Sequence, residues 1–186
     1  MARSSARPPK RHPGGPSKKP RLSRADAAKA QSDHDNAWRQ WVSDGAVEAV
    51  DTALTHVQTV VEDQVLQFGA FPVFVVTGSK DGEFELNSLD PADTADRRPD
   101  DVLEELRAMT AAKASDLLVA ALAYPATLPD RSGARAVIVE VEHRERLSLE
   151  VVQEYKTVES KGKTFVNFGD PHTDRRWDPW LFTVRH

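Results

Sequence analysis

The chain of 186 residues contains no cysteine, which excludes disulfide bonds, thiolate metal ligands and cysteine nucleophiles. Long apolar runs are also missing, because no stretch approaches the length of a membrane-spanning helix and the N-terminus has no apolar signal-peptide core. We therefore expect a cytoplasmic protein without membrane partners. Isoleucine occurs only at Ile138, and sixteen Arg stand against nine Lys, which indicates a GC-rich bacterial genome of actinobacterial type.

Acidic residues are absent from positions 1–25, which carry eight Lys and Arg. Because the formal net charge is -4, residues 26–186 must carry -4 - 8 = -12. The sequence thus joins a basic N-terminal segment to an acidic body.

The first 35 residues hold five of the twelve prolines and almost no large apolar side chain. Such a segment cannot bury enough surface to offset its ordering entropy, so we predict a disordered basic arm over 1–35 and a single α+β domain over 36–186. The arm could contact nucleic acid, could be a solubilising leader without a partner, or could fold back on the acidic body. Its candidate polyanion-binding residues are Arg7, Lys10, Arg11, Lys18, Lys19, Arg21 and Arg24.

The first half of the domain predicts one amphipathic helix and one hairpin. Ser43 or Asp44 is a suitable N-cap, the valines that follow recur at helical spacing, and Gly69 is a suitable stop. The strings FPVFVVT and EFELN then flank the glycine-containing turn GSKDG, which is typical of a β-hairpin.

The second half predicts another helix from Pro99 to the residue before Pro125, then a hairpin over 135–156 and a strand at KTFVNFG. We expect the apolar residues of 177–182 to pack back on the core. The predicted fold class is α+β, with an antiparallel sheet, two main helices on one face, and the order α-β-β-α-β-β-β.

The hairpin over 135–156 carries acids on one side of its strands. Alternation places Val139 and Val141 on one face, with Glu140 on the other. The register that matches the apolar faces pairs Val141 with Leu149 and sets Glu140 opposite Glu150. Opposed like charges are unfavourable, so they need solvent, neighbouring bases or a bridging cation. We favour a solvent-exposed acidic face.

This acidic face is the predicted surface for a protein partner, which could be basic. Its candidate binding residues are Glu140, Glu142, Glu150, Glu154, Arg144 and Arg146. A metal-dependent hydrolase is the alternative use of the same acids, because Glu154-Tyr155-Lys156 matches the short E-x-K pattern of metal-dependent nucleases. The loop with Asp170, His172 and Asp174 could also hold a divalent ion, although turn chemistry around a proline is the commoner role of such a loop.

Conventional catalytic motifs are missing from the sequence. There is no G-x-S-x-G, P-loop, dinucleotide fingerprint, H-E-x-x-H or zinc-ligand spacing. We therefore predict no catalytic residues, no metal site and no cofactor, and favour a protein that is not an enzyme.

The strings QFGAFPVF, DGEFEL and RAVIVEVEHRE, followed by Tyr155 and VNFG, resemble an uncharacterised family of small bacterial α+β proteins. The family layout has a Phe-Gly-x-Phe strand, an Asp-Gly-Glu turn and a Glu-His-Arg strand. The resemblance covers roughly residues 67–169, and it departs at Pro72, one place early, and at Glu154, where the family has proline. It implies the fold and no activity.

Three functions follow as hypotheses. The first is a non-enzymatic binding or regulatory module, similar to immunity or adaptor proteins, that meets a partner through its acidic body. The second is a nucleic-acid-associated protein that acts through the basic arm, with steep salt dependence. The third is the metal-dependent hydrolase. We favour the first.

Overall fold

The computed structural model describes residues 23–129 and 133–182. Five helical segments precede or separate the strands, namely α1 (Arg24–Asp35), η1 (Ala37–Gln40), α2 (Asp44–Phe68), α3 (Pro91–Thr94) and α4 (Pro99–Ala112). The strands are β1 (Phe74–Ser79), β2 (Phe84–Ser88), β3 (Leu117–Leu128), β4 (Ala134–His143), β5 (Leu147–Ser160), β6 (Lys163–Phe168) and β7 (His172–Arg175).

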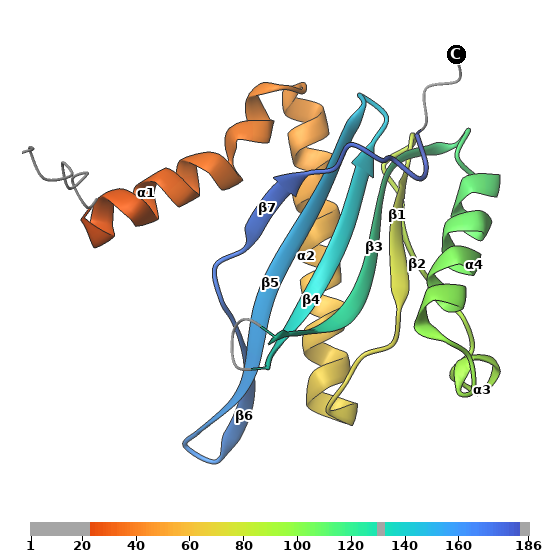
Figure 1. Ribbon diagram of the computed structural model, residues 1–186. Helices are drawn as coiled ribbons and strands as arrows, with labels where there is room; N and C mark the ends of the chain where they lie inside the picture. The colour runs from red at the N-terminus through yellow and green to blue at the C-terminus, as the bar shows by residue number, and fades with distance from the viewer. Residues whose placement is uncertain (1–22, 130–132, 183–186) are drawn as a thin grey trace, which may run out of the picture.

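All strand pairs are antiparallel, and the sheet order is β2-β1-β3-β4-β5-β6. The long strand β5 pairs with β6 over its second half, and its first half pairs with β7, which lies off the main path. Figure 1 shows the curved sheet with α2 behind it, α4 at one side and α1 projecting at the other. The predicted fold class, α+β with an antiparallel sheet and two main helices, is confirmed, and β3 and β7 are added to the predicted strands.

Helix α2 forms as the sequence predicts. The Ser43 hydroxyl oxygen accepts a hydrogen bond from the Ala46 N–H at 3.2 Å, and the helix ends where Gly69 adopts a left-handed conformation with φ 75°. One side of the helix is buried against the sheet, through Ala46, Val50, Ala53, Val57, Val61 and Val65.

The two main helices cover opposite faces of the sheet, so the prediction that they share one face is wrong. Val76 and Val139 belong to the apolar cluster under α2. Val75 and Leu122 point the other way and pack with Leu106 of α4. Because alternate residues of a strand point to opposite faces, a strand that is apolar at every position can contact a helix on each side.

The predicted second helix is too long. Helix α4 ends at Ala112, and the apolar run that follows becomes β3, which lies between β1 and β4. Residues 119–123 are completely buried between the α2 and α4 clusters. Their alanines favour a helix in isolation, but pairing with two strands outweighs that local preference.

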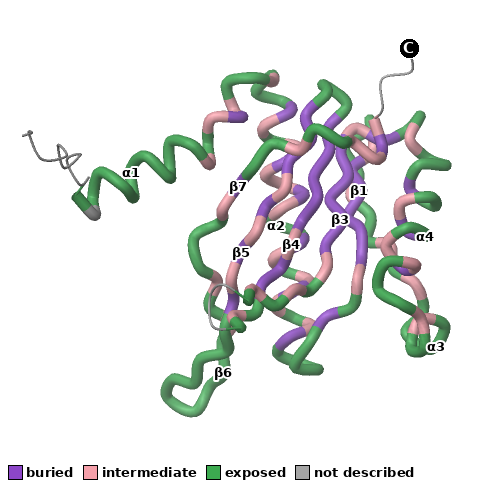
Figure 2. Tube along the Cα trace, viewed as in Figure 1, coloured by how far each residue is buried: buried purple, intermediate pink, exposed green. Residues whose placement is uncertain are grey.

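The predicted disordered arm is corrected over residues 24–35, which form α1. The Ser23 hydroxyl oxygen accepts a hydrogen bond from the Asp26 N–H at 3.1 Å and so caps the helix. None of the α1 side chains that the structure describes is buried, as Figure 2 shows by its exposed colour. The arm residues Arg7, Lys10, Arg11, Lys18, Lys19 and Arg21, and the side chain of Arg24, lie outside what the structure describes.

The segment after β7 packs back on the core, as predicted, but not at every residue. Leu181 is buried, and Trp180 and Phe182 pack against the cluster under α4. Trp177 is 82% exposed, and its ring and that of Trp41 lie 4.5 and 5.2 Å from the guanidinium of Arg175.

Candidate functional site: an acidic cavity beneath α1

The predicted register of the acidic hairpin is confirmed. Val141 pairs with Leu149, Val139 pairs with Val151, and Glu140 stands directly opposite Glu150. The sequence therefore identified the like-charge contact correctly, although not the groups that relieve it.

Glu140 is only 4% exposed, so the prediction of a solvent-exposed acidic face is wrong at this residue. Arg107 of α4 donates to both carboxylate oxygens at 2.8 Å, and an Arg176 nitrogen lies 2.6 Å from Oε2. The Tyr124 hydroxyl donates to Oε1 at 3.4 Å. A buried carboxylate needs such partners, and here α4 and the residue that follows β7 supply the arginines.

Glu142 is completely buried and holds the C-terminal segment. Its carboxylate accepts backbone N–H hydrogen bonds from Trp180 at 2.5 Å and from Leu181 and Phe182 at 3.0 Å each. Glu140 and Glu142 are thus structural carboxylates, and neither is accessible to a partner in this structure.

The other predicted binding residues have different surroundings. Arg144 donates to the carbonyls of Leu117 and Ala114 at 2.9 and 2.6 Å, so it fastens the hairpin end to the first residue of β3 and to the turn before that strand. Arg146 is exposed in the turn, with φ 65°. Glu150 and Glu154 are half-buried.

Glu154 lies in a cavity of about 560 Å³ between α1, the end of β3, β5 and the loop before β7. The described residues that line this cavity include three carboxylates and neither lysine nor arginine. The lining residues are Gln31, Asp35, Leu128, Pro129, Val152, Glu154, Asp170, Pro171 and His172. We call this hollow the acidic cavity.

The α1 wall of the acidic cavity is held by polar contacts with β7. Asp35 Oδ1 accepts the Thr173 N–H at 2.9 Å and lies 3.1 Å from His172 Nδ1. The Gln31 amide nitrogen lies 2.7 Å from the same ring nitrogen, so the tautomer of His172 decides which contact is a hydrogen bond. His34 and Asp174 add a further contact at 3.2 Å.

Asp170 differs from Asp35 in its contacts. Within residues 23–129 and 133–182, its side chain makes no hydrogen bond or ion pair. The cavity wall therefore contains one carboxylate that is fixed by neighbours and one that a ligand can approach without displacing a partner.

The structure brings together part of what the sequence singled out. Glu154, Asp170 and His172 meet in the acidic cavity, and Asp174 lies beside it, with its carboxylate 3.1 Å from His172 Nε2 and 3.2 Å from His34 Nε2. Sequence reasoning missed Gln31 and Asp35, because it assigned them to the arm. The capping serine at position 23 and the change from basic to mixed charge after residue 25 were the available indications of a helix there.

In the part of the chain that the structure describes, no three His, Asp or Glu side chains are placed to hold a metal ion. The hydrolase hypothesis also depends on Glu140, whose carboxylate already contacts Arg107 and Arg176.

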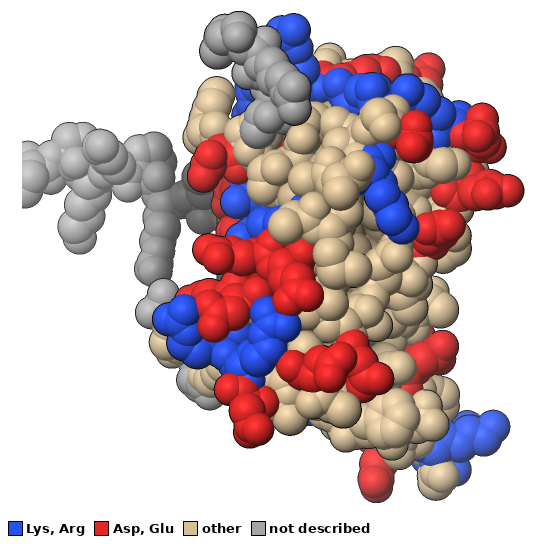
Figure 3. All heavy atoms as spheres, turned by 90° about the vertical axis from the view of Figure 1, so that its right-hand side faces the viewer, with Lys and Arg blue, Asp and Glu red and all other residues tan. Residues whose placement is uncertain are grey.

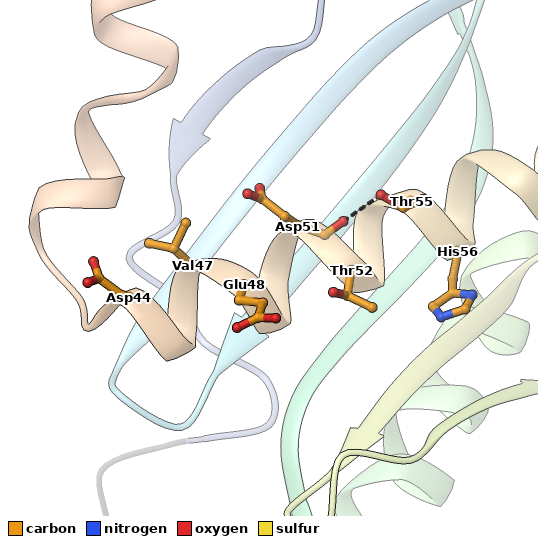
Figure 4. A pocket seen from close by; sticks show the side chains of 7 residues that line it. All are labelled: Asp44, Val47, Glu48, Asp51, Thr52, Thr55 and His56. Atoms are coloured by element: carbon orange, nitrogen blue, oxygen red, sulfur yellow. Dashed lines mark hydrogen bonds between the residues drawn. The ribbon is translucent and has the colours of Figure 1, made fainter.

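A second hollow, of about 440 Å³, runs along the outer side of α2 (Figure 4). All its lining residues belong to that one helix, from Asp44 to His56, so it is a surface depression without an opposite wall. Three acids line this hollow, and one of them, Asp51, is already paired, because Arg39 donates to both of its carboxylate oxygens at 2.7 and 2.8 Å. It is a weaker candidate than the acidic cavity.

No protein-family model, curated protein or solved structure matches this chain. None of the described helices has the length and apolar character needed to cross a membrane. The resemblance to an uncharacterised bacterial family thus stays an expectation from the sequence, and the function must be argued from the site.

Proposed function

We propose that this protein is a non-enzymatic binding module that recognises a basic segment of another protein through the acidic cavity. The single observation that carries the proposal is a cavity of about 560 Å³ whose described lining contains three carboxylates and neither lysine nor arginine. This cavity replaces the acids of the hairpin as the contact surface, and only Glu154 is common to both.

The size and lining of the acidic cavity suit a lysine or arginine side chain. Binding sites are typically cavities of roughly 300–1,000 Å³ with apolar walls and a few convergent polar groups. Leu128, Pro129 and Val152 offer apolar surface for an aliphatic stem, while Asp170 offers charge for its end.

The charge on other faces supports this location. On the face formed by the α4 side of the molecule, acidic and basic side chains stand on both sides of an uncharged band (Figure 3). A basic partner would meet like as well as unlike charge there, whereas the described lining of the acidic cavity contains carboxylates and neither lysine nor arginine.

Calorimetric titration of the full chain with a short arginine–serine peptide tests the proposal. We expect binding that weakens as salt is added, since the contact is electrostatic. Asp170→Asn should weaken binding about two- to fivefold, as expected for one solvent-exposed charge contact.

Asp63→Asn is the matched control, because it removes the same charge from an exposed position on α2. It should leave the affinity unchanged. Equal losses in both variants would mean that the peptide responds to the overall negative charge, and binding of a glutamate–serine peptide with similar affinity would contradict the proposal outright.

A further inference from the structure

The basic segment 1–22 joins the described structure at the N-terminal end of α1, the helix that forms one wall of the acidic cavity. It contains seven Lys and Arg and no acid, and it connects to Ser23, the N-cap of α1. The last turns of that same helix supply Gln31 and Asp35 to the cavity wall. We propose that residues 1–22 bind in the acidic cavity of their own chain and compete there with the basic partner. This inference rests on the proposed function of the cavity.

The length of the segment permits this contact. A helix rises 1.5 Å per residue, so Gln31 lies only about 12 Å along α1 from Ser23. The stretch from Arg11 to Ser23 spans up to about 40 Å when extended, so Lys10 and Arg11 reach the cavity even if the chain must reverse direction before α1.

Charge and tethering favour the acidic cavity over other surfaces. The outer side of α2 is also acidic, but its hollow has no opposite wall and Arg39 already neutralises Asp51. The exposed pair Trp41 and Trp177 is centred on Arg175, which repels a basic segment. A tethered ligand acts at an effective concentration in the millimolar range, which falls as the span grows, so the nearest acidic cavity has the advantage.

A single spin label tests the contact in the full chain. Because the sequence has no cysteine, Ser5→Cys provides the only labelling position. The nitroxide should broaden the amide signals of Val152, Asp170 and His172, which are distant in sequence, and leave Asp63 of α2 unaffected. Asp170→Asn combined with Glu154→Gln should reduce the broadening. Unbroadened cavity signals, or equal broadening at Asp63, would overturn the inference.

A mixing experiment separates contacts within one chain from contacts between copies. One population is isotope-labelled and carries no nitroxide, and the other carries the nitroxide at natural isotope abundance. We expect no broadening in the mixture. Broadening that appears there as strongly as in the singly labelled protein would assign the contact to a second copy and overturn the intramolecular proposal.

Competition is tested by replacing the seven bases of 1–22 with glutamine in the full chain. The affinity for the arginine–serine peptide should rise about tenfold or more, because the intramolecular competitor is removed. An unchanged affinity would overturn the competition. If neither protein binds the peptide, the proposed function fails, while the spin-label result still decides whether the segment occupies the cavity.

Discussion

At the scale of single residues, Glu140 and Glu142 stand two positions apart on one face of β4 and are satisfied by different means. Two arginine side chains approach Glu140, whereas three backbone N–H groups converge on Glu142. Both arrangements satisfy a carboxylate that burial would otherwise penalise. Each makes a measurable prediction.

Tyr124 reports on the Glu140 cluster. Burial, followed by the negative charges of Glu140 and Glu150, raises the pKa of its hydroxyl to about 12, because both effects disfavour the phenolate. Replacing Glu140 with Gln should lower the pKa of Tyr124, since one of the repelling charges is removed. A spectrophotometric titration of phenolate absorbance checks this.

The protein has only two tyrosines, so Tyr124→Phe identifies which transition belongs to Tyr124 and which to Tyr155. A Tyr124 transition at the same pH with and without the Glu140 charge would contradict the assigned electrostatic cause.

Glu142→Ala should destabilise the protein by about 2–4 kcal/mol, because three backbone N–H groups would lose a buried acceptor. Urea unfolding measures the free energy of unfolding. Glu83→Ala is the control, since Glu83 is exposed in the β1–β2 turn and should change stability by less than about 0.5 kcal/mol. A loss below about 1 kcal/mol at Glu142 would show that water replaces its carboxylate.

At the scale of elements, the N-terminus of α2 is tied to the β4–β5 turn. Ser43 donates its N–H to Glu145 Oε2 at 2.8 Å and its hydroxyl to Oε1 at 2.6 Å, while its hydroxyl oxygen accepts from Ala46. One side chain thus caps the helix and fastens it to the hairpin. The hydrogen bonds from Ser43 lower the pKa of Glu145 below the ordinary value of 4.5.

This lowered pKa predicts a pH-dependent contribution to stability. Because the folded state favours the charged form of Glu145, the contribution is complete above the ordinary pKa of about 4.5 and is lost as the pH falls through the lower folded pKa. Wild type should therefore exceed Glu145→Gln in stability at neutral pH and converge with it in acid. Urea unfolding across about pH 3 to 7 checks this. A constant difference over that range would contradict the assignment.

Helix α4 and strand β3 show where element prediction fails. The sequence from Leu117 to Ala123 has no polar residue, so it has neither the period of an amphipathic helix nor that of a half-buried strand. Its length and alanine content suggested a helix. The choice of a strand depends on partners far away in sequence, because β1 and β4 bind its two edges and α2 and α4 cover its two faces.

At the scale of the whole molecule, α1 lies outside the apolar core. It contacts β7 through polar side chains such as Asp35 and His34, and it forms one wall of the acidic cavity. A helix without buried apolar surface has little tertiary stabilisation. The acidic cavity therefore has one firm wall, the sheet, and one wall that opens at low energetic cost.

Hydrogen exchange should reveal this difference. Amides of α1 should exchange at least about a hundredfold faster than those of Val57 and Val61 in α2, because opening α1 exposes no core. Amide-resolved exchange by NMR measures both helices in one sample, and α2 is the internal control. Comparable protection in the two helices would contradict the view that polar contacts alone hold α1.

The sequence by itself determined the elements with local signals: the capped helix α2, the β1–β2 hairpin, and the β4–β5 register down to the opposition of Glu140 and Glu150. Periodicity, caps and turn residues act between near neighbours, so they can be read without the fold. Only the tertiary structure decided that Glu140 and Glu142 are buried, that Leu117–Leu128 is a strand, and that Asp35 joins Asp170 and Glu154 around one cavity. Each of these depends on which distant segment covers a face or supplies a partner, and no local pattern specifies that.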